Sequence, residues 1–140
     1  MMVNIQLEQN ELSTFLACLG LGTLVAIQKG QLSAEAGVWT MGAPRVWEPF
    51  VDGAVVPQEV LEVFQQSDEL ATLQKLAPDS YEEELERLIN QLASTLNRGA
   101  SPEPVWRLRW NWDEEEKREE KRAIRLDRSR KNTRLQKIAA

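Results

Sequence analysis

The longest uncharged stretch of the chain is residues 15–27 (FLACLGLGTLVAI), in a sequence of which 28% is charged. As a helix it would be about 20 Å long, at ~1.5 Å per residue, which is shorter than the ~30 Å hydrocarbon core of a membrane. Its apolar residues do not keep to one side, so we expect neighbouring elements all round it. The pattern predicts a buried central helix, with Asn10 as its N-cap and Gly30 just beyond its end. Gly20 and Gly22 are expected where another element passes close to the backbone.

Further helix signals follow the central helix. Ser33 is a favourable N-cap, and Pro44 suits the first position of a new helical turn. Pro57 is expected to open another helix, which is amphipathic. Ser80 and Glu83 have the spacing of a capping box, in front of apolar residues that recur every three and four positions. These signals predict a set of short and medium helices that pack on the central one.

Two short segments alternate between apolar and polar residues instead. Apolar and polar residues take every second position in residues 3–7 (VNIQL) and again in residues 106–112 (WRLRWNW). A period of two is typical of half-buried strands, and the two segments could pair with each other. The alternative is that the tryptophan segment stays unpaired until it meets a partner. Both possibilities remain open from the sequence.

The sequence therefore predicts a mainly α fold. A compact helical domain surrounds the buried central helix, a small two-stranded β element joins the N-terminal and tryptophan-rich segments, and a polar helical tail follows. We place the domain at residues 1–112, with 7 basic and 15 acidic groups and a net charge of −8. The tail, residues 113–140, has 10 basic and 7 acidic groups, net +3, and is expected to be helical or partly disordered. Asp113 is the expected N-cap of the tail helix.

Composition excludes several classes of site. The chain has no histidine and a single cysteine, so Ser-His-Asp and Cys-His triads, Cys/His zinc sites and an internal disulfide are all excluded. We expect no catalytic residue, no cofactor and no metal. The N-terminus has no basic region ahead of its apolar stretch, which predicts neither an export signal nor a membrane anchor. A cytoplasmic location fits these features.

Two groups of residues stand out as a candidate protein-binding surface. One is an acidic helix face and the other is the tryptophan segment with its arginine, a residue pair common at interface hot spots. An acidic helix face is most often simply solvated, and this plainer interpretation stands beside the functional one. The candidate residues are Glu82, Glu83, Glu86, Trp106, Arg107, Trp110 and Trp112.

Residues 29–36 (KGQLSAEA), with the apolar helix before them and the Pro44-Arg45 turn and two acidic helices after them, carry a resemblance. Over about residues 3–98 the chain is similar to a family of short uncharacterised bacterial helical proteins. Gly37 departs from the longer second helix expected there, and the tryptophan segment and tail lie outside the similarity. Proteins of this size and acidity resemble the immunity partners of bacterial toxins. The resemblance implies action by binding and transfers no functional residue.

We predict a non-enzymatic cytoplasmic protein that acts by stoichiometric protein–protein binding, as an immunity or antitoxin-like inhibitor of a basic toxin or nuclease. Its oligomeric state is left open. The alternative is nucleic-acid binding through the basic tail, with tryptophans as stacking platforms. The tail residues that would serve it are Arg122, Arg125, Arg128, Arg130, Lys131, Arg134 and Lys137. The net charge of −8 in the first 112 residues weighs against that alternative.

Overall fold

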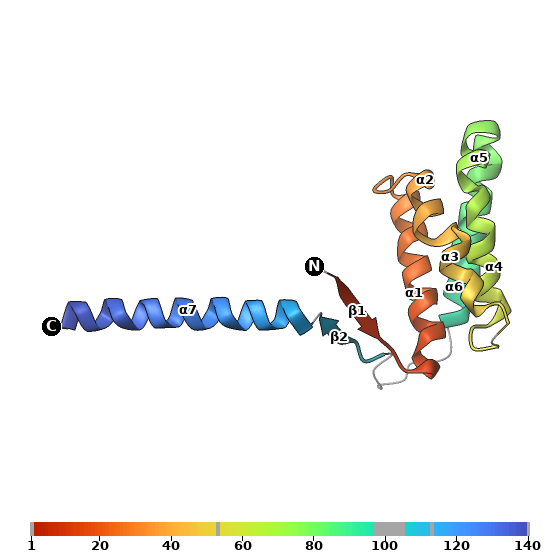
Figure 1. Cartoon of the computed structure of the whole chain (residues 1–140). Helices are drawn as coiled ribbons and strands as arrows, with labels where there is room; N and C mark the ends of the chain where they lie inside the picture. The colour runs from red at the N-terminus through yellow and green to blue at the C-terminus, as the bar shows by residue number, and fades with distance from the viewer. Residues whose placement is uncertain (1, 53, 97–105, 113, 140) are drawn as a thin grey trace. The chain divides into compact units, whose positions relative to one another are not determined.

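The computed structural model describes residues 2–52, 54–96, 106–112 and 114–139. The chain forms two compact units, Leu7–Arg107, called the body, and Met1–Gln6 with Leu108–Ala140, called the tail unit. This division differs from the sequence boundary after residue 112 because strand β2 (Arg109–Trp112) pairs with strand β1 (Val3–Gln6). Helices account for most of both units, and one small antiparallel sheet pairs the N-terminal strand with the strand that precedes the C-terminal helix (Figure 1). The predicted mainly α fold with a small β element is confirmed.

Helix α1 spans Gln9–Gln28 and has well-defined ends. Its N-cap is Glu8, whose backbone N–H donates to Oε2 of Glu11 at 3.2 Å. The prediction of Asn10 as N-cap was therefore wrong by two residues, because the Glu11 carboxylate satisfies this end of the helix. At the other end Gly30 has φ +73°, and its N–H donates to the Ile27 carbonyl at 3.0 Å. The predicted glycine stop is confirmed.

Burial on α1 is one-sided. Its buried residues are Leu16, Ala17, Gly20, Thr23, Leu24 and Ile27. Leu19 lies on the other side and is 43% exposed, so the predicted all-round enclosure is wrong. The helices that pack on α1 cover one side of it only. A Cβ on Gly20 would lie 2.9 Å from Leu92 Cδ1, whereas one on Gly22 would meet nothing within 4 Å. The close approach is confirmed at Gly20 and wrong at Gly22.

A run of short turns follows α1. Helix α2 (Ala34–Gly37) is capped by the Ser33 hydroxyl, which accepts the Ala36 N–H at 3.0 Å as predicted. A single π-helical turn, η1 (Val38–Gly42), continues directly from it. Helix α3 (Pro44–Trp47) begins at its proline, also as predicted, and the 3₁₀ turn η2 (Glu48–Phe50) ends the run.

The second half of the body is built from longer helices. Helix α4 (Gln58–Gln66), the 3₁₀ turn η3 (Ser67–Glu69) and helix α5 (Leu70–Leu76) lead into helix α6 (Pro78–Leu96). The Tyr81 N–H donates to the Ala77 carbonyl at 2.9 Å, so α6 begins at Pro78 and the predicted Ser80 N-cap was wrong. The sequence places the end of this helix at Gly99, a residue outside the described part of the chain.

The core lies where α1, α4, α5 and α6 meet, and α1 packs most extensively on α6. These helices lie side by side in the body (Figure 1). The largest fully buried side chains come from six elements, and they are Leu24, Met41, Val60, Val63, Phe64, Ser67, Leu70, Leu88 and Leu92. Met41 enters this core from the π-helical turn, which ties the short helices to the long ones.

In the tail unit, strand β1 (Val3–Gln6) pairs antiparallel with strand β2 (Arg109–Trp112), as predicted. The register sets Val3 opposite Trp112 and Ile5 opposite Trp110. Strand β2 is shorter than the alternating segment of residues 106–112, because Trp106, the first residue of that segment, belongs to the body. Helix α7 (Glu114–Ala139) is one uninterrupted helix, and its expected N-cap Asp113 lies outside the described residues.

Among the described residues one helix, α1, is long and apolar enough to cross a membrane. Length and composition alone support this, and the core helix of a soluble protein or a signal sequence passes the same test. A third of the apolar window, 33%, is buried inside the fold. In this structure α1 is a core helix, since it provides the apolar side that α4 and α6 cover.

Candidate protein-binding surface

Helix α6 has two chemically distinct faces. Leu85, Leu88 and Leu92 recur at helical spacing and are buried in the core. The predicted carboxylates Glu82, Glu83 and Glu86 lie on the other face and are exposed. We call these three residues the acidic row. Within the described part of the chain none of them forms an ion pair, so the structure leaves their charges unneutralised.

One glutamate on the same helix, Glu84, does form an ion pair. Glu84 accepts hydrogen bonds from Arg87 Nε at 2.8 Å and from Arg87 Nη2 at 2.6 Å, a bidentate ion pair. The same guanidinium also donates to the side-chain oxygens of Gln66 and Gln91, which links α6 to α4. The hydrogen bond from Arg87 lowers the pKa of Glu84, and it raises the pKa of Arg87. Glu84 therefore supports the fold, while the acidic row does not.

A hollow of about 450 Å³ borders the acidic row. Most of its lining is polar and includes the carboxylates of Glu82 and Glu86, while Ile27 and Leu85 add a smaller apolar area. Tyr81 also lines it, and partial burial, together with the charge of Glu82, raises the pKa of its hydroxyl. The combination of apolar lining and carboxylates suits a basic side chain with an aliphatic stem, such as lysine or arginine.

The tryptophan segment is divided between the two units. Trp106 belongs to the body, where its ring meets Phe15 edge-on, with centroids 5.7 Å apart and an interplanar angle of 86°. Arg107 follows it and is exposed. Trp110 lies in β2 and is 57% exposed, and Trp112 lies in the same strand with its side chain outside the described part. The seven predicted binding residues are therefore divided between the units, five of them in the body and two in the tail unit.

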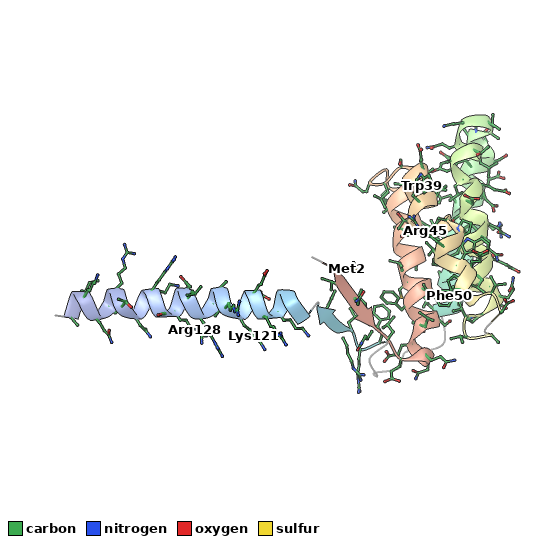
Figure 2. All side chains as sticks on the ribbon, in the orientation of Figure 1. Met2, Trp39, Arg45, Phe50, Lys121 and Arg128 are labelled. Atoms are coloured by element: carbon green, nitrogen blue, oxygen red, sulfur yellow. The ribbon has the colours of Figure 1, made fainter. Side chains whose placement is uncertain are left out.

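Helix α7 carries the basic residues of the nucleic-acid alternative. All of them, from Arg122 to Lys137, are exposed along the helix. Lys121 and Arg128, labelled in Figure 2, both project from it. Lys131 Nζ forms an ion pair with Asp127 Oδ2 at 3.0 Å. From residue 122 onward Asp127 is the single acidic residue of the sequence against seven basic ones.

Sequence reasoning missed a second hollow, of about 400 Å³, between the π-helical turn and α5. Trp39 (Figure 2) and Leu76 line it and are 62% and 79% exposed. We call it the Trp39 hollow. A tryptophan in a short apolar helix is expected to be buried, so the sequence contains no signal for this exposure. It arises because Met41, two residues on, takes the core position.

No family model, curated protein or solved structure matches the chain. The resemblance to short bacterial helical proteins consequently stays a prediction. Among the described residues no three His, Cys, Asp or Glu side chains gather closely enough to hold a metal ion.

Proposed function

We propose that the body acts by stoichiometric binding to a basic protein surface, through the acidic row and its hollow. The observation that carries this proposal is the contrast along α6. Glu84 is neutralised by Arg87, while Glu82, Glu83 and Glu86 are exposed without an ion pair in the described structure. Three like charges within five residues repel one another, which is unfavourable for the isolated protein and favourable in a complex with cations.

The wider charge supports the same proposal. Residues 1–112 have a net charge of −8, which would raise the association rate with a basic partner. An inhibitor of a basic toxin or nuclease, in the manner of an immunity or antitoxin protein of the cytoplasm, is the kind of role that these features suit. Such an inhibitor needs no catalytic residue of its own. The hollow beside the row would receive the aliphatic stem of a partner lysine or arginine.

A charge-reversal pulldown from the source cell tests the proposal. Wild-type protein should retain a basic partner at ~0.15 M salt, and calorimetry on that partner should give a fixed stoichiometry. Reversal of Glu82, Glu83 and Glu86 to Lys should weaken the complex and slow its association.

A matched control reverses Glu48, Asp52 and Glu59, three exposed acidic residues elsewhere on the body. This variant changes the net charge equally and should retain the partner. An equal loss of partner binding in both variants would mean that overall charge, and not the acidic row, is responsible for binding. Retention in both would contradict the acidic row as the binding surface.

Nucleic-acid binding remains a second candidate, favoured by the exposed basic residues of α7. Its test is binding of single-stranded RNA or DNA at physiological salt, with and without residues 121–140. Binding that disappears with this segment, and that declines steeply as salt rises, would support the second candidate over the first.

A further inference from the structure

The Trp39 hollow is an apolar site with charged residues at its edge. Trp39, Ala71 and Leu76 supply apolar surface, and Glu35, Asp68 and Lys75 supply charge. Neither carboxylate nor the ammonium group forms an ion pair within the described residues. A complementary ligand would carry a bulky aliphatic group with both a cation and an anion close beside it.

The backbone holds Trp39 firmly in this position. The Thr40 hydroxyl donates to the Ala36 carbonyl at 2.6 Å across the turn. Gly42, at the end of the same turn, packs so closely on η3 that a Cβ would lie 2.9 Å from the Asp68 nitrogen and from Ser67 Oγ. The exposed indole is thus presented by a fixed π-helical turn, an element that occurs frequently at functional sites.

Helix α7 carries a group of the complementary kind. Ile124 is 49% exposed, and one helical turn further on it is followed by Asp127 at i+3 and Arg128 at i+4. Residues at these spacings are neighbours on one side of a helix, so an aliphatic group, an anion and a cation lie together. Leu126, 62% exposed, projects from the opposite side of the helix.

We propose that Ile124 of one molecule docks in the Trp39 hollow of a second copy, with Arg128 facing Glu35 and Asp68, and Asp127 facing Lys75. The opposite arrangement of charges at the two surfaces is the argument for a second copy as the occupant. The exchange is reciprocal in a two-fold symmetric dimer, so each contact is made twice. Asp127 would give up its intrahelical ion pair with Lys131 for Lys75 of the other copy.

Two such contacts make a modest interface. A large aromatic side chain buries ~150–250 Å², whereas stable interfaces bury ~1,200 Å² or more in total. The dimer should therefore be weak and salt-sensitive, with a Kd in the micromolar range, and should dissociate on dilution.

Sedimentation equilibrium of the full chain from ~1 to ~100 µM tests the proposal. The wild type should approach twice its 16.0 kDa mass at the upper end in low salt. Ile124→Ser and Trp39→Ser should each raise the dissociation constant about tenfold or more, the loss of ~1.4 kcal/mol. Leu126→Ser, matched in chemistry and exposure, should dimerise as the wild type does.

A charge exchange adds a test that does not depend on truncated side chains. Lys75→Glu and Asp127→Lys should each weaken the dimer, and the double variant should recover it. A monomer at every concentration would overturn the proposal, and so would equal effects of Ile124→Ser and Leu126→Ser. A monomer in which Ile124→Ser alters the tryptophan fluorescence of the wild type, but not that of Trp39→Ser, would show contact within one chain instead. That result would overturn the second copy as occupant.

Discussion

The body and α7 are both helical, yet they handle apolar side chains in opposite ways. The body encloses Leu24, Leu88 and Leu92 completely among other helices. On α7, by contrast, Ile124, Leu126, Leu135 and Ile138 are all exposed. Burial therefore stabilises the helices of the body, whereas α7 relies on its length of 26 residues and on local interactions such as Lys131–Asp127. The comparison shows that helical structure alone does not indicate a core.

The largest expected effect is within α1, where buried and exposed leucines can be compared. Leu24→Ala should lower the free energy of unfolding by about 2–5 kcal/mol, because it leaves a cavity in a closed core. Leu19→Ala should have a much smaller effect, since that side chain is 43% exposed. Chemical denaturation of both variants measures the difference. Equal losses would mean that both sides of α1 are enclosed.

The two glycines of α1 give the next largest difference. Gly20→Ala should destabilise the body by about 1–3 kcal/mol, since the new Cβ would press on Leu92 and Phe64. Gly22→Ala meets open space, and the better helix propensity should stabilise the body by up to ~1 kcal/mol. Thermal melting of the two variants measures the sign of each change in stability. A stabilising Gly20→Ala would contradict the tight packing of α1 on α6.

Removal of the tail helix should sharpen the contrast between the units. Deletion of residues 113–140 should leave the melting temperature of the body nearly unchanged, because the described apolar side chains of α7 are exposed. Trp106→Ala should lower it, because the edge-on ring pair with Phe15 contributes ~0.5–1.5 kcal/mol beyond its buried area. Calorimetric scans of both proteins measure the two effects. A melting temperature that falls only on deletion of the tail would assign α7 a structural role in the body.

The smallest expected effect concerns the ion pair on α6. The hydrogen bond from Arg87 holds the pKa of Glu84 below its ordinary value of 4.5. The folded state thus binds the proton less tightly than the unfolded state, so the stabilisation is present above that pH and is lost as the pH falls through the lowered pKa. Glu84→Gln should cost less than ~1 kcal/mol at pH 7, since the pair is partly exposed.

A matched substitution controls for the change in charge. Glu83→Gln removes an exposed carboxylate that has no ion pair in the described structure, and it should leave stability near neutral pH almost unchanged. Urea melts at pH 7 and below pH 4 separate the two variants. A difference between Glu84→Gln and the wild type that persists in acid would exclude the carboxylate as its source.

The sequence by itself determined the features that depend on neighbouring residues. Gly30 ends α1, Ser33 caps α2 and Pro44 begins α3, because each controls hydrogen bonds within a few positions of itself. The alternation of apolar and polar residues in segments 3–7 and 106–112 predicted the strand pair. The difference in net charge between residues 1–112 and residues 113–140 likewise follows from the sequence alone.

Only the tertiary structure decided which apolar groups are covered. Leu92, Phe64 and Met41 approach Gly20 from three different elements, and nothing near Gly20 or Gly22 in the sequence distinguishes the two positions. Likewise, the burial of Met41 leaves Trp39 exposed, and the contact with Phe15 places Trp106 in the body instead of in the strand. Burial is set by contacts between distant parts of the chain, and a periodic pattern specifies a face without specifying what covers it.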